Sequence, residues 1–113
     1  MINVDEGGAI RVVRGDTGEL AVTPRYEDGE VYRLKEGEEI RFLVYLFPEK
    51  PLLEKGSDAQ GEDGAVAFYF SAAETDLPVG VYGYRAKLVG SDGAEIARID
   101  TFIGATAGRF EVI

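Results

Sequence analysis

The sequence contains no histidine and no cysteine. The residues that most often serve as general base, thiol nucleophile and transition-metal ligand are therefore missing, and no disulfide framework can form. The three serines are Ser57, Ser71 and Ser91. Each occurs in a turn or cap context, and none lies in a Gly-x-Ser-x-Gly nucleophile elbow. Carboxylate-only catalysis stays compatible with the composition, but the acidic residues concentrate in turns. We therefore expect a protein that is not an enzyme, with no cofactor and no metal site.

Positive charge and long apolar runs are also scarce. Twelve Lys and Arg against 21 Asp and Glu give a net charge of −9. Such a surface repels phosphate groups, which makes nucleic acid and anionic membranes poor partners. The longest apolar run, Phe42–Pro48, is of strand length, well below the ~20 residues of a membrane-spanning helix. Residues 1–10 lack the basic start and apolar stretch of a signal peptide, which favours a chain made and kept in the cytosol.

What the sequence does contain is a strong alternation of apolar residues, in a length of 113 residues that suits a single domain, 1–113. The alternation is clearest in Glu39–Phe47, Gly64–Ser71 and Val79–Val89, and it is typical of β-strands. Further strands are expected near Ile10–Arg14, Thr17–Thr23 and Arg109–Ile113. The predicted core consists of the residues on the stronger faces: Phe42, Val44, Phe68, Phe70, Tyr82, Leu88 and Phe110.

Asp-Gly pairs separate these runs, and such pairs close hairpins and tight turns. They predict hairpins over Tyr26–Leu34 and Val81–Ile103. Short strands with frequent turns indicate an all-β sandwich or barrel, and we expect an immunoglobulin-like antiparallel β-sandwich of about seven to eight strands. A capping box in Ser71–Glu74 predicts one helical turn, and Pro48–Asp63 is expected to be the longest loop.

Two kinds of motif have a functional and a structural interpretation. Residues 58–64 and 91–95 resemble calcium loops, but neither has the regular oxygen spacing or the final bidentate Glu of an EF-hand. Arg14-Gly15-Asp16 is the integrin-recognition tripeptide, which binds when it is exposed on a loop tip. In all three segments the favoured interpretation is a polar turn closed by Gly and by Asp side chains.

The second face of two strong strands is also apolar, where a solvated sheet would be polar. Leu43, Tyr45, Phe47 and Tyr69 occupy this face. Either they form an exposed patch that binds a protein partner, another copy or a neighbour, or the Pro48–Asp63 loop covers them. The Tyr82 hydroxyl is expected to bond to backbone and not to a ligand, as buried tyrosines usually do.

The order of motifs along the chain resembles a known family. The motifs are the Gly15-Asp16-Thr17 opening, the segment Leu77-Pro78-x-Gly80-x-Tyr82-x-Tyr84, and the ending Gly108-x-Phe110-x-Val112. In this order they are similar to the N-terminal immunoglobulin-like domain of tailed-phage upper baseplate proteins and to related small phage and prophage β-sandwich proteins. The resemblance spans nearly the whole chain except Pro48–Asp63.

The resemblance implies a virion component that is made in the host cytoplasm and packs against copies of itself and neighbouring tail proteins, with no catalytic residues. Family members often continue into a helical or receptor-binding region, whereas this sequence ends at Ile113. The alternative is a bacterial surface or secreted β-sandwich that binds a glycan or a protein. The absence of Trp disfavours the glycan version.

Overall fold

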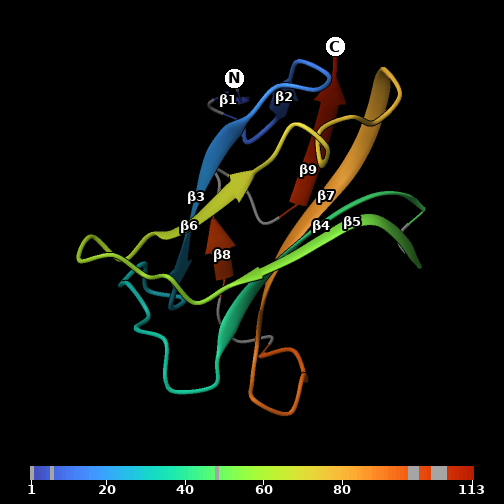
Figure 1. Cartoon of the computed structure of the whole chain (residues 1–113). Helices are drawn as coiled ribbons and strands as arrows, with labels where there is room; N and C mark the ends of the chain where they lie inside the picture. Colours follow the sequence, from blue (N-terminus) through green and yellow to red (C-terminus); the bar gives the residue numbers. More distant parts are fainter. Residues whose placement is uncertain (1, 6, 48, 97–99, 103–106) are drawn as a thin grey trace.

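The computed structural model describes residues 2–5, 7–47, 49–96, 100–102 and 107–113. These residues form an all-β fold of two sheets, without a helix, which confirms the predicted class (Figure 1). The larger sheet has the strand order β1-β2-β9-β7-β4-β5 and the smaller one β6-β3-β8. The strands are β1 (Ile2–Val4), β2 (Ile10–Val12), β3 (Gly18–Arg25), β4 (Glu39–Phe47), β5 (Lys50–Ser57), β6 (Val66–Phe70), β7 (Gly80–Val89), β8 (Asp100–Phe102) and β9 (Ala107–Val112).

The core lies between the sheets and is built from the alternating residues of β4, β6 and β7. The Phe42 ring is at its centre, with ring centroids 5.6 Å from Phe70 and 5.5 Å from Tyr84. Offset and edge-on contacts of this kind stabilise aromatic clusters beyond simple area burial. All seven core residues expected from the alternation are buried: Phe42, Val44, Phe68, Phe70, Tyr82, Leu88 and Phe110.

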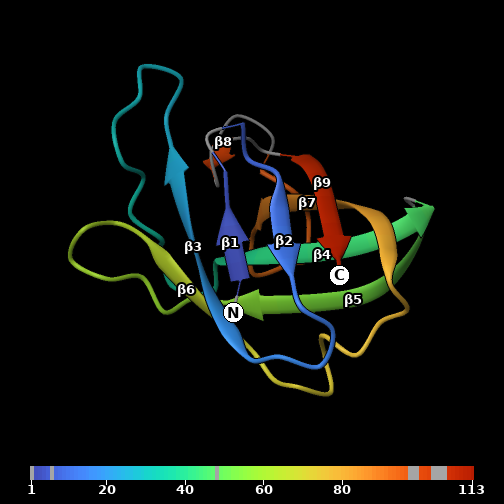
Figure 2. The same ribbon diagram turned by 90° about the horizontal axis from the view of Figure 1, so that it is seen from above.

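The larger sheet is mixed, and the expectation of a purely antiparallel sandwich is wrong in this respect. β2 pairs with β9 in parallel, with Ile10 opposite Phe110 and Val12 opposite Val112. The chain passes between the two sheets several times after β2, and its last strand, β9, lies beside β2 and runs in the same direction. Figure 2 shows these two strands side by side, crossed at a steep angle by β4 and β5.

The prediction of a long loop over residues 48–63 is also wrong, because residues 50–57 form β5 along the edge of β4. Leu53 faces Val44 and packs against the core, which gives this segment a reason to be a strand. Irregularities in the register between Val44 and Phe47 accommodate Pro51. Proline is tolerated at sheet edges and bulges, so its presence did not exclude a strand. Pro48 lies outside the described residues.

The expected turns exist, but both predicted hairpins, over residues 26–34 and 81–103, are shorter than predicted. Arg25 and Val31 form a single bridge around the turn at residues 27–29, and no strand follows before β4. The turn at residues 91–93 is closed by a bridge between Val89 and Glu95, whereas β8 pairs with β3 and not with β7. Ile103, the end of the second expected hairpin, lies outside the described residues.

The capping box forms its hydrogen bonds without a helix. The Ser71 backbone N–H donates to Glu74 Oε1 at 2.9 Å, and the Glu74 N–H donates to Ser71 Oγ at 3.3 Å. The Thr75 N–H donates to the Ser71 carbonyl, four residues earlier, at 3.2 Å, so the segment is the single helical turn predicted and does not extend into a helix. In the parts of the chain that the structure describes, no helix is long and apolar enough to cross a membrane.

The Tyr82 hydroxyl donates to the backbone carbonyl of Pro78, as predicted. This bond ties the start of β7 to the turn that leads into it. The Tyr84 hydroxyl donates to the carbonyl of Gly8, which fastens the N-terminal segment to the same strand. Both tyrosines therefore satisfy their buried hydroxyl groups on backbone atoms.

Candidate interaction surface

The four residues of the predicted second face do not form one patch. Leu43, Tyr45 and Phe47 lie on β4 in the larger sheet, whereas Tyr69 lies on β6 in the smaller one. The inward faces of these two strands meet in the core, where the Phe42 and Phe68 ring centroids are 6.1 Å apart. Their outward faces therefore point away from each other. Tyr69, with 57% of its surface exposed, is on the opposite side of the molecule from the other three.

Leu43 is covered by the strands on either side of it. It keeps only 8% of its surface exposed and has Glu54 and Arg85 as its lateral neighbours. Arg41, two residues before it, donates to Glu39 at 2.8 Å and reaches Glu54 at 3.4 Å. The hydrogen bond to Glu39 is the main cause of the raised pKa of Arg41. Long charged side chains shield apolar surface in this way along their stems.

Tyr45 is half-buried because its ring lies over Gly83 of β7. A Cβ atom at Gly83 would come within 2.6 Å of the Tyr45 ring. The glycine in the middle of a strand therefore provides the space for the aromatic ring. This packing fixes Tyr45 against the sheet and leaves the end of the hairpin as the exposed part.

The end of the β4–β5 hairpin carries three of the exposed apolar side chains. Leu46, Phe47 and Leu52 have 58%, 64% and 49% of their surface exposed, and we call these three residues the hairpin tip. The register shift between Tyr45 and Phe47 ends the regular alternation, which is why Leu46 is not buried as its position in the alternation indicated. Leu52 was missed because it lies in the segment expected to be a loop.

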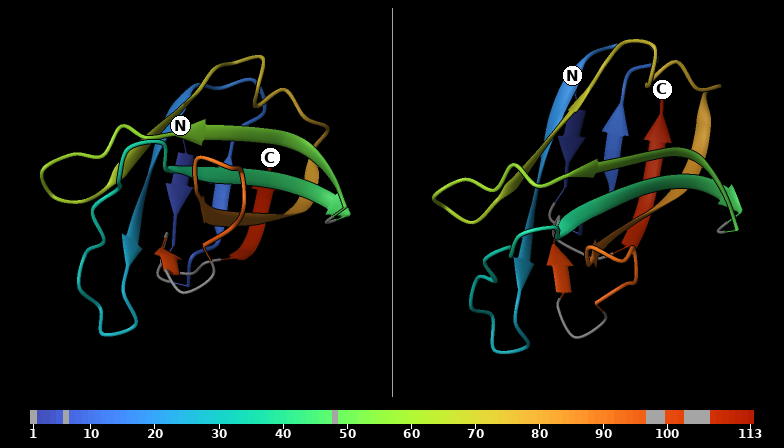
Figure 3. Two further views of the ribbon diagram at one scale, coloured as in Figure 1. Left: turned by 90° about the horizontal axis from the view of Figure 1, so that it is seen from below. Right: turned by 60° about the horizontal axis from the view of Figure 1, so that its bottom comes forward.

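The tip extends past the rest of the larger sheet, as both views of Figure 3 show. β5 lies beside β4 in the same sheet and does not lie over its outward face. The alternative in which residues 48–63 fold back over Leu43, Tyr45 and Phe47 is therefore wrong. Leu46 and Phe47 are consecutive in β4 and therefore point to opposite faces of the hairpin. Large exposed apolar side chains on a projecting hairpin are typical of a contact surface.

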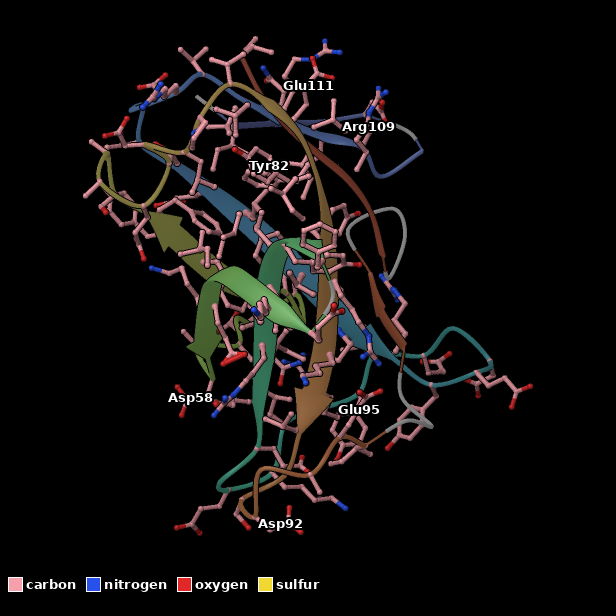
Figure 4. The ribbon with its side chains drawn as sticks, turned by 90° about the vertical axis from the view of Figure 1, so that its right-hand side faces the viewer. Asp58, Tyr82, Asp92, Glu95, Arg109 and Glu111 are labelled. Atoms are coloured by element: carbon pink, nitrogen blue, oxygen red, sulfur yellow. The ribbon has the colours of Figure 1, made fainter. Side chains whose placement is uncertain are left out.

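The calcium-like segments are turns closed by their own side chains. Asp63 Oδ1 accepts from the Ala65 N–H at 3.1 Å, and Asp92 Oδ1 accepts from the Ala94 N–H at 3.0 Å. The carbonyl oxygens of residues 61 and 62 accept from the Arg33 guanidinium. Figure 4 shows Asp58 and Asp92 at the surface of the lower part of the molecule. No group of three or more potential metal ligands occurs among the described residues.

The Arg-Gly-Asp tripeptide forms an exposed turn joined to the turn before β7. Arg14 Nε donates to Asp76 Oδ1 at 2.8 Å, and Gly15 has a positive φ of 77°. The buried Thr75 hydroxyl donates to the Asp16 carbonyl. The tripeptide thus connects two loops at one end of the sandwich.

A small hollow of about 110 Å³ lies over β1, β2 and β9. Arg11 and Arg109 flank Glu111 there, with N–O distances of 3.6 and 3.9 Å (Figure 4 labels Arg109 and Glu111). These distances are at the limit for ion pairs, and the arginines are about half-exposed. Asp5 also lines the hollow, so its two cationic and two anionic side chains balance in charge.

No family model, curated protein or solved structure matches this chain.

Proposed function

We propose that this chain is a non-enzymatic assembly module that binds other protein chains through the hairpin tip. The observation that carries the proposal is the exposure of Leu46, Phe47 and Leu52 together at the end of a projecting hairpin. Burial of apolar surface is the main favourable term in protein association, and aromatic residues are the usual anchors. The acidic surface, with a net charge of −9, keeps the free chain soluble and disfavours wrong partners.

The setting we propose is the tail of a phage or prophage, with a baseplate-type immunoglobulin-like domain. The resemblance of the motifs from Gly15 to Val112 supports this setting. The bond from Tyr82 to the carbonyl four residues upstream supports the immunoglobulin-like version of the fold, because such sandwiches use a tyrosine corner of this kind. Two sheets packed over an aromatic core agree with it.

The proposal is tested by co-expressing the chain with each protein encoded by the genes beside its own. We expect a stoichiometric complex with one of them, or with a second copy of the chain. Phe47→Ser should weaken this complex by roughly 10-fold or more, as loss of an aromatic anchor does. Tyr69→Ser is the matched control, since it removes an equally exposed aromatic from the opposite side. Equal binding by the parent and Phe47→Ser would contradict the proposal.

A further inference from the structure

The outer edge of β5 is the long open edge of the larger sheet. The sheet ends in β1, of 3 residues, on one side and in β5, of 8 residues, on the other. Within the described part of the chain, β5 forms its strand pairing with β4 alone. Its second half approaches the other sheet through side chains alone: the Lys55 ammonium lies 5.4 Å from the centre of the Phe70 ring, and Ser57 Oγ donates to the Ala67 carbonyl. An edge of this length is a template for pairing with another strand.

The sequence along this edge is complementary to itself. Residues 49–55 read Glu-Lys-Pro-Leu-Leu-Glu-Lys. In an antiparallel pair centred on Leu52, Lys50 lies opposite Glu54 and Glu49 lies opposite Lys55. The two-fold symmetry of such a pair repeats each contact, so every charge in the segment meets an opposite charge. Opposite charges directly across a strand pair stabilise it, and like charges destabilise it.

We propose that two copies of this chain pair antiparallel through β5, in the register that places Leu52 opposite Leu52. The inference rests on the proposed function, and it identifies the partner of the β4–β5 hairpin as a second copy of the chain. Of the hairpin tip, Leu52 alone meets its symmetry mate at the two-fold axis, because Phe47 lies on β4 opposite Lys50, one strand away from the contact between the copies. The larger sheets of the two copies then form one continuous sheet.

Three of the four charged side chains of this pairing are exposed in the single chain. The Glu54 side chain is 42% exposed and contacts Arg41 at 3.4 Å. Glu49 and Lys50 are exposed at the turn between β4 and β5. The Lys55 side chain is only 23% exposed and already contacts Glu74 at 2.6 Å, so the register depends on the pair of Lys50 with Glu54.

Two features of the backbone set a limit on the pairing. Leu52 is skipped in the register between β4 and β5, so the strand is irregular at the proposed centre. Pro51 lacks an N–H group, so the backbone ladder between the two β5 strands is short one donor in each copy. The side-chain pairs consequently decide the register. Because a two-fold pairing uses the β5 edge of both copies, it closes at the dimer and does not continue into a fibre.

The test is a charge exchange followed by sedimentation equilibrium over a range of protein concentrations. Lys50→Glu places like charges opposite Glu54 at two symmetric positions, and we expect the dimer dissociation constant to rise by about 10-fold or more. Glu54→Lys should have the same effect. The double variant Lys50→Glu, Glu54→Lys restores opposite charges and should return the constant to within about 3-fold of the parent.

Two control variants carry the same charge changes away from β5. Lys35→Glu and Glu36→Lys lie in the exposed turn before β4 and should leave dimerisation unchanged. A thermal melt of each variant confirms folding, and the recovery by the double variant separates a lost pair from a damaged fold.

The results distinguish this inference from the proposed function. A monomeric parent that binds a neighbour-encoded protein through Phe47 overturns the dimer and supports the assembly role. If the parent is a dimer and the double variant raises the dissociation constant as much as each single variant does, the proposed register is wrong. A parent that is monomeric and binds none of the neighbouring proteins overturns both proposals.

Discussion

At the scale of single residues, Phe42 lies at the centre of the aromatic core. It is fully buried and contacts aromatic rings from β6, β7 and β9, so its removal leaves a cavity that the surrounding strands cannot close. We expect Phe42→Ala to lower the free energy of unfolding by roughly 3–5 kcal/mol. The exposed Phe47→Ala is the control and should change it by about 0.5 kcal/mol or less. Urea unfolding measures both, and a similar small loss in the two variants would contradict this packing.

Glu74 links stability to pH. The hydrogen bond from Lys55, at 2.6 Å, is the main cause of its lowered pKa, and the Ser71 N–H adds to it. A carboxyl with a lowered pKa in the folded state binds protons more readily when unfolded. Its contribution to stability is therefore complete above the ordinary Glu pKa of about 4.3 and is lost as pH falls through the lower folded value.

The pH dependence is measured by comparing the parent with Glu74→Gln. The variant should be less stable than the parent at pH 7, and the difference between the two should shrink as the pH falls from about 5 to below the folded pKa. Other carboxyl groups titrate in both proteins and cancel in this comparison. A difference that stays constant with pH would show that the Glu74 charge contributes nothing.

At the scale of elements, β5 is the strand that departs most from the sequence pattern. Its pairing with β4 predicts that the amides of residues 50–57 that bond to β4 exchange hydrogen much more slowly than free backbone. Hydrogen exchange resolved by residue measures this in the dilute chain. Uniformly fast exchange over the whole segment would show a loop, as its composition alone indicated.

The same elements explain how far the sequence predicts the fold. β4, β6 and β7 were predictable because each alternates between a buried aromatic or aliphatic face and a second face. β5 was not, because Pro51 and Gly56 are read as turn residues unless the edge position is known. The parallel pairing of β2 with β9 depends on contacts between the two ends of the chain, which local patterns do not contain.

The interaction surface was predictable only in part, for a related reason. The sequence left open whether Phe47 is exposed or covered by the following segment, and the structure shows it exposed. Alternation assigns residues to a face of a strand but does not say which sheet the strand joins, so the pattern grouped Tyr69 with residues that lie on the other side of the molecule. The burial of Leu43 could not be predicted either, because the residues beside it belong to the neighbouring strands β5 and β7. Leu46 and Leu52 are exposed because the strand register shifts near the tip, and no local signal marks such a shift.

At the scale of the whole molecule, the sandwich has a net negative charge, a projecting apolar hairpin and other exposed apolar side chains, among them Val79 and Val81 at the start of β7. The outward face of the larger sheet carries ion pairs, such as that of Arg85 with Glu95 at 2.6 Å. Exposed ion pairs of this kind contribute little stability and leave the sheet face hydrated. The hairpin tip differs from this background, and the assembly role depends on it.

The most direct measurement of this role is hydrogen exchange of the chain in the free and the assembled state. The assembled state is the complex obtained by co-expression or the dimer formed at high concentration. The account predicts slower exchange in the assembled state within residues 45–55 and unchanged exchange within residues 66–70, around Tyr69. Slower exchange confined to the Tyr69 side, with the hairpin unchanged, would contradict the account, as would a chain that assembles under neither condition.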